Sequence, residues 1–130
     1  MGATKASLEH VNFTVTNSAR TAQMLCDVFG WRIRWNGPAK SGGTTFHVGD
    51  DDAYIAVYTP PPGRALGEPD TLRRGGLNHV GVLVDDLDAV EARVRGAGFE
   101  PFNFADYAPG RRFYFLDADG IEFEVVSYAV

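Results

Sequence analysis

Histidines are the residues of this chain best suited to chemistry, and two of the three stand in matching surroundings. His10 lies in LEHVNFTV (residues 8–15), and His79 lies in LNHVGVLV (77–84). Imidazole binds metal ions and changes its charge near neutral pH. A polar ring within a segment as aliphatic as LNHVGVLV therefore needs an explanation, which depends on the elements that position it.

These two segments open an internal repeat, which predicts two modules of the same layout. Each segment reads as a strand and is followed by a helical pattern with a capping residue at its start. The cap is Asn17 or Ser18 in the first copy, and Asp85 or Asp86 in the second. A glycine then ends each predicted helix.

Three shorter runs of aromatic and β-branched residues follow each predicted helix, as expected for strands. They read WRIRW, TTFHVG and AYIAVYT in the first module, and EPFNF, RRFYFLD and IEFEVVSY in the second. We therefore predict an α+β fold of two βαβββ modules, residues 6–59 and 77–128, within a single domain spanning residues 1–130. The proline- and glycine-rich residues 60–76 connect the modules. Each sheet carries a helix on one face, which leaves the opposite faces free to form a shared cavity.

Composition excludes several classes of function. A chain of 130 residues that is 45% hydrophobic suits one compact domain, and its net charge of -5 argues against a nucleic-acid partner. No apolar run is long enough to span a membrane, and no targeting segment is recognisable, so we expect a cytoplasmic protein without a membrane partner. The single cysteine, Cys26, excludes an internal disulfide and a thiolate metal cluster.

The chain resembles the vicinal oxygen chelate superfamily over nearly its whole length. This group contains glyoxalases, extradiol dioxygenases, fosfomycin-resistance proteins and bleomycin-resistance proteins. The resemblance rests on the paired H-V-x-x-x-V strands, on the module spacing and on the ending FYFLDADGIEFEVV (113–126). That ending is similar to the family signature F-x-D-P-D-G-x-x-x-E-L, with Ala118 in place of the usual proline.

The resemblance implies that the metal ligands lie on the first and last strands of the modules, at His10, His79 and Glu124. Strand alternation agrees, because it puts all three side chains on the face opposite the helix. Aligning YIAVYT (54–59) with EFEVVS (122–127) puts Ala56 at the remaining family position, where a methyl group cannot bind metal. Two imidazoles and a carboxylate suit one divalent ion of Fe, Mn, Co, Ni or Zn and leave coordination positions open.

Two further residues are candidates for a catalytic role. The resemblance implies that Tyr114 contacts substrate. Aligning TTFHVG (44–49) with RRFYFL (111–116) puts His47 at the position equivalent to Tyr114, where an imidazole could transfer protons at neutral pH. Lys40, Arg111 and Arg112 lie in loop-like segments and are available for a carboxylate or phosphonate.

The resemblance implies a divalent-metal-dependent enzyme that acts on a small oxygen-bearing molecule. Isomerisation, epoxide opening and ring cleavage all remain open. The alternative is a metal-free protein that sequesters a hydrophobic or aromatic compound, as bleomycin-resistance proteins do. In either case we expect a small-molecule ligand and a homodimer whose sites form between modules, within one chain or across two.

Overall fold

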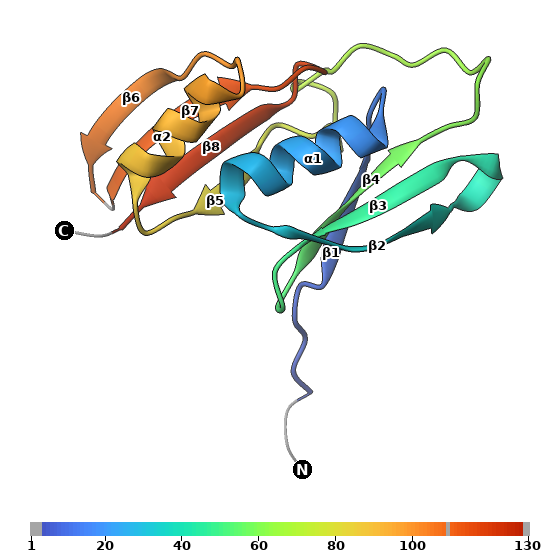
Figure 1. Cartoon of the computed structure of the whole chain (residues 1–130), viewed down its shortest axis with the longest axis horizontal. Coiled ribbons are helices and arrows are strands. Elements are labelled where there is room, and N and C mark those ends of the chain that lie inside the picture. The colour runs from blue at the N-terminus through green and yellow to red at the C-terminus, as the bar shows by residue number, and fades with distance from the viewer. Residues whose placement is uncertain (1–3, 109, 129–130) are drawn as a thin grey trace. The chain divides into compact units, whose positions relative to one another are not determined.

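A computed structural model describes residues 4–108 and 110–128 of the chain (Figure 1). Residues 1–3, 109 and 129–130 of the predicted domain lie outside this part. The chain divides into two compact units, the first made of Met1–Cys26 and Gly30–Arg64 and the second of Asp27–Phe29 and Ala65–Val130. Each unit contains one four-stranded sheet.

Unit 1 follows the predicted order of strand, helix and three strands. Its elements are β1 (His10–Thr14), α1 (Ser18–Phe29), β2 (Arg32–Pro38), a short 3-10 helix η1 (Lys40–Gly42), β3 (Thr44–Gly49) and β4 (Tyr54–Thr59). The sheet order is β1-β4-β3-β2. The β1 and β4 strands are parallel, whereas the other neighbours are antiparallel.

Unit 2 repeats this arrangement. Its elements are β5 (Val80–Leu83), α2 (Leu87–Gly96), β6 (Phe102–Tyr107), β7 (Gly110–Leu116) and β8 (Glu122–Ser127). The sheet order is β5-β8-β7-β6, with β5 parallel to β8. The predicted α+β class with two βαβββ modules is therefore confirmed. The predicted strand 77–84 is shorter in the structure, and His79 lies immediately before it.

Side-chain caps determine where the two helices begin. Asn17 Oδ1 accepts a hydrogen bond from Arg20 N at 3.1 Å, and Asp86 Oδ1 accepts one from Ala89 N at 3.0 Å. Each bond satisfies a backbone N–H group that has no partner within its own helix. Of the alternatives that the sequence left open, the caps are therefore Asn17 and Asp86.

Strand alternation builds the core of unit 2 on one face of its sheet and leaves the alternate side chains on the opposite face. Phe113 and Phe115 of β7 are fully buried, as are Phe123 and Val125 of β8. The rings of Phe115 and Phe123 stack with centroids 5.2 Å apart. Because successive side chains of a strand point to opposite faces, the residues between these apolar positions must face away from this core.

No helix in the described part of the chain combines the length and apolar character that crossing a membrane requires.

The cap assignment predicts that alanine substitutions at two neighbouring aspartates lower the free energy of unfolding by different amounts. Asp86→Ala should lower the free energy of unfolding by about 1 kcal/mol, because the N–H of Ala89 loses its acceptor. Asp85→Ala makes the same change one residue earlier and should leave stability nearly unchanged. Urea denaturation followed by circular dichroism measures both. Equal losses in the two variants would contradict the assignment.

Candidate functional site

His79 and Glu124 meet on the face of the unit 2 sheet that points away from the core. His79 Nε2 lies 3.1 Å from Glu124 Oε1. Glu124 sits in the middle of β8, where it pairs with Gly81 of β5, and its side chain is only 13% exposed. The buried neighbours Phe123 and Val125 fix which face it occupies. Two of the three predicted metal ligands therefore converge within one sheet.

The second ring nitrogen of His79 also has a partner. Nδ1 lies 2.7 Å from Asn78 Oδ1, while Nε2 faces the Glu124 carboxylate. Both partner atoms are acceptors, yet a neutral imidazole carries only one N–H. With the Asn78 amide oxygen towards Nδ1, a cation in place of the second proton satisfies both contacts. A donor set that orients Nε2 towards a carboxylate in this way fits a metal ligand.

His10 in unit 1 has the same type of support from its preceding residue. Its Nδ1 atom lies 2.8 Å from Glu9 Oε1, which accepts a hydrogen bond from Nδ1–H. In the neutral ring, Nε2 then carries no proton. Both predicted histidine ligands are thus oriented through Nδ1. This is the usual arrangement for histidines that bind metal through Nε2.

Arg112 is a further residue of this site, which the sequence places both in the predicted strand RRFYFLD and in a loop-like segment. It lies in β7 instead of a loop, and its Nη1 donates to Glu124 Oε2 at 2.8 Å. Both side chains are mostly buried, at 14% and 13% exposed. Burial acts to lower the pKa of Arg112, but the hydrogen bond and charge of Glu124 outweigh burial and raise it.

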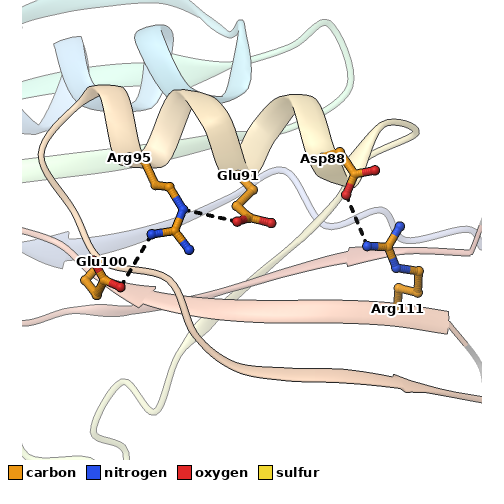
Figure 2. A network of polar contacts seen from close by, with 5 residues as sticks. All are labelled: Asp88, Glu91, Arg95, Glu100 and Arg111. Atoms are coloured by element: carbon orange, nitrogen blue, oxygen red, sulfur yellow. Dashed lines mark hydrogen bonds and ion pairs between the residues drawn. The ribbon is translucent and has the colours of Figure 1, made fainter.

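The side chain of Arg111 points to the opposite face of the sheet from that of Arg112. Figure 2 shows it reaching Asp88 near the start of α2, where Arg111 Nη2 donates to Asp88 Oδ1 at 3.1 Å. The pattern RRFYFL contained the signal for this difference. Since Phe113 and Phe115 form the core, alternation puts Arg111 on the helix side and Arg112 on the other side.

Tyr114 is the direct strand partner of Glu124. Its ring meets the ring of His79 edge-on, with centroids 6.1 Å apart. Burial raises the pKa of Tyr114, and the charge of Glu124 and a hydrogen bond with it act in the same direction. The phenol therefore keeps its proton at neutral pH and remains a hydrogen-bond donor beside the carboxylate.

A cavity of about 510 Å³ opens over this face of unit 2. Its walls combine amide, charged and aromatic side chains, namely Asn78, His79, Asn103, Phe104, Ala105, Tyr107, Arg112, Tyr114 and Glu122. Asn103 has a positive φ of 53° at the irregularity in β6 between Phe102 and Ala105. Such bulges re-aim side chains near binding sites. The cavity can hold a small organic molecule next to His79 and Tyr114.

The matching face of unit 1 carries a row of aromatic rings. His47 lies 5.1 Å from Trp35 and stacks on Tyr54 at 4.6 Å between centroids, and Tyr54 stacks on His10 at 4.9 Å. His47 pairs with Ala56 just as Tyr114 pairs with Glu124, so the strand register agrees with the sequence alignment of the modules. Ala56 contributes no ligand.

The environment of His47 favours its neutral form. Burial is the largest cause that lowers its pKa from 6.5, and the charges of His10 and Arg34 lower it further, against a smaller opposite effect of Glu9. A neutral imidazole at pH 7 can accept a proton, which is the chemistry predicted for His47.

The predicted ligands are divided between the units. His79 and Glu124 belong to unit 2, whereas His10 belongs to unit 1. Across residues 4–108 and 110–128, no three His, Cys, Asp or Glu side chains form a group that could hold a metal ion. Unit 2 thus brings together His79, Glu124 and Tyr114, and unit 1 contains His10 and His47 in its row of rings.

Comparison with known proteins gives a family and a fold. Residues 7–125 match the family described as the Glyoxalase/Bleomycin resistance protein/Dioxygenase superfamily. No curated protein sequence matches the chain.

Solved structures share the architecture at low sequence identity. A glyoxylase/bleomycin resistance protein/dioxygenase domain from Frankia sp. EAN1pec is 22% identical, with a TM-score of 0.82 and coverage of 95% of this chain and 93% of that one. The fosfomycin resistance protein FosX from Mesorhizobium loti is 24% identical, with a TM-score of 0.71 and coverage of 98% and 94%. A mutant FosX from Listeria monocytogenes, complexed with Mn(II) and 1S,2S-dihydroxypropylphosphonic acid, is 20% identical, with a TM-score of 0.72 and coverage of 96% and 94%.

The environment of His47 predicts its titration. Its proton NMR midpoint should lie below 6.5 and should rise in His10→Gln and, by less, in Arg34→Gln, because each removes a positive charge. Arg32→Gln is the control, since Arg32 pairs with Asp51 and does not act on His47. The unfolded chain binds this proton more readily, so the associated stability is present above about pH 6.5 and lost on acidification. A midpoint at or above 6.5 in the wild-type protein would contradict this description.

Proposed function

Because the chain belongs to the Glyoxalase/Bleomycin resistance protein/Dioxygenase superfamily, we propose that it is a divalent-metal-dependent enzyme acting on a small oxygen-bearing organic molecule. The observation that carries this proposal is the contact of His79 Nε2 with Glu124 Oε1 at 3.1 Å, made while Nδ1 faces another acceptor. A cation between the imidazole and the carboxylate satisfies both groups. The Mn(II) complex of a FosX structure with the same fold gives further support.

His10, His79 and Glu124 would hold the ion. His79 and Glu124 already face each other, and His10 is the equivalent of His79 in the other module, with its Nδ1 atom held in the same way. Two imidazoles and one carboxylate suit Fe, Mn, Co, Ni or Zn. Fewer protein ligands than coordination positions leave room for two neighbouring oxygens of a substrate.

When bound, the ion would act as a Lewis acid that stabilises negative charge developing on a substrate oxygen. Tyr114, which stays protonated, would turn its O–H from Glu124 to a substrate oxygen in the cavity of unit 2. His47, which stays neutral, accepts a proton from the substrate or returns it. Isomerisation, epoxide opening and ring cleavage all use these roles, and the residues do not select one of them.

The second candidate function is metal-free sequestration of an aromatic compound. The row of rings formed by Trp35, His47, Tyr54 and His10 favours it, because a flat molecule can extend such a row. Trp35 remains 49% exposed, so its ring would be the one on which the flat molecule stacks. Under this alternative, purified protein binds aromatic ligands with the same affinity in the presence and absence of a divalent ion.

Metal titration separates the two functions. The wild-type protein should bind one Mn(II) per chain by isothermal titration calorimetry, and His79→Ala and Glu124→Gln should each weaken binding at least about tenfold. Glu122→Gln is the matched control, because it removes the same charge from the same strand without removing a contact to His79, and it should weaken binding much less. Absence of Mn(II) binding, or equal losses in Glu122→Gln and Glu124→Gln, would contradict the proposed site.

We also propose that the protein is a homodimer, as relatives of this size generally are. Closed two-fold pairing would give two equivalent sites. Sedimentation equilibrium should then report twice the chain mass of 14.2 kDa. A monomer mass at concentrations where Mn(II) still binds would rule the dimer out as a requirement for the site.

A further inference from the structure

We propose that Arg112 is the receptor for an anionic group of the ligand, and that this anion and a divalent cation on Glu124 bind cooperatively. The inference rests on the proposed metal-dependent function and names the class of ligand: a carboxylate or other oxyanion attached to an apolar or aromatic body. The juxtaposition that carries it is the mostly buried Arg112–Glu124 pair, of which Arg112 lines the unit 2 cavity.

The pair has unused donor capacity. A guanidinium carries five N–H groups. In Arg112, Nη1 donates to Glu124 at 2.8 Å and Nη2 reaches the Gly110 carbonyl only at 3.5 Å. Nε is buried and has no hydrogen-bond partner among the described residues. Because Arg112 lines the cavity while its Nε atom is buried, the weakly held Nη2 group is the donor that an additional acceptor would reach.

The internal repeat indicates that Arg112 serves the site and not the fold. Strand register makes Thr45 the unit 1 equivalent of Arg112, and Ala56 the equivalent of Glu124. Unit 1 forms the same four-stranded sheet without either charge. The guanidinium and the carboxylate are thus present together in one module and absent together in the other.

Charge balance determines what the pair does when a cation arrives. Glu122 and Glu124 exceed Arg112 by one negative charge on this face, which favours a cation. A divalent ion reverses the excess to one positive charge, because the two carboxylates carry one charge fewer than the ion and the guanidinium together. In a partly buried site this imbalance is strong, and an anion restores neutrality.

Aromatic side chains next to Arg112 indicate the body of the ligand. The guanidinium carbon lies 5.0 Å from the centroid of the Tyr107 ring. Tyr107 and Phe104 both line the cavity and are 60% and 53% exposed. A ligand whose anionic group binds Arg112 would therefore place its apolar part against these rings.

Benzoate and Mn(II) test the coupling by isothermal titration calorimetry. Saturation with Mn(II) should tighten benzoate binding about tenfold, and benzoate should tighten Mn(II) binding by the same factor. Benzamide has the same shape without the charge and should show no such effect. In Arg112→Gln the enhancement should disappear, whereas Arg111→Gln, which removes the adjacent charge on the helix side, should retain it.

Arg112→Lys is a second variant that separates loss of function from loss of structure, because it keeps the charge and removes only the planar guanidinium. It should retain part of the coupling, with thermal unfolding confirming that each variant is folded. Mn(II) binding that leaves benzoate affinity unchanged would overturn this inference alone, as would full enhancement in Arg112→Gln through direct contact with the ion. Failure of the wild-type protein to bind Mn(II) would instead overturn the proposed function, and the coupling with it.

Discussion

One carboxylate, that of Glu124, links the two basic side chains of the unit 2 site. Its Oε1 atom faces His79 Nε2 at 3.1 Å, and its Oε2 atom accepts from Arg112 at 2.8 Å. With Glu124 only 13% exposed, water screens these interactions much less than it would at a surface. A change of charge at one group is therefore felt by the other two, which is why the metal and anion proposals depend on the same residue.

The hydrophobic core holds this carboxylate in place. Phe123 and Val125 commit alternate positions of β8 to the core, which leaves Glu124 no other face. The same strand pairing recurs in unit 1, where Ala56 occupies the equivalent position. The repeated module thus carries the Arg112–Glu124 pair in one sheet and lacks it in the other.

Most of the fold could be predicted from the sequence, because an internal repeat and strand alternation are local patterns. The same alternation predicted that His79 and Glu124 share a face in the second module. The contact of Arg112 with Glu124 was not predicted, since it depends on how β7 pairs with β8 and on the side-chain conformations. The Nδ1 partners of the histidines were not predicted either, because these contacts depend on side-chain rotamers.

The proposed function depends on one divalent ion that His10, His79 and Glu124 would hold together. Pulsed electron paramagnetic resonance of the Mn(II)-loaded protein tests it directly, because nitrogen nuclei bound to the ion modulate the electron spin echo. Modulation from two imidazole nitrogens is expected, reduced to one in His10→Ala and in His79→Ala. An echo without nitrogen modulation, or modulation that neither substitution alters, would contradict the account.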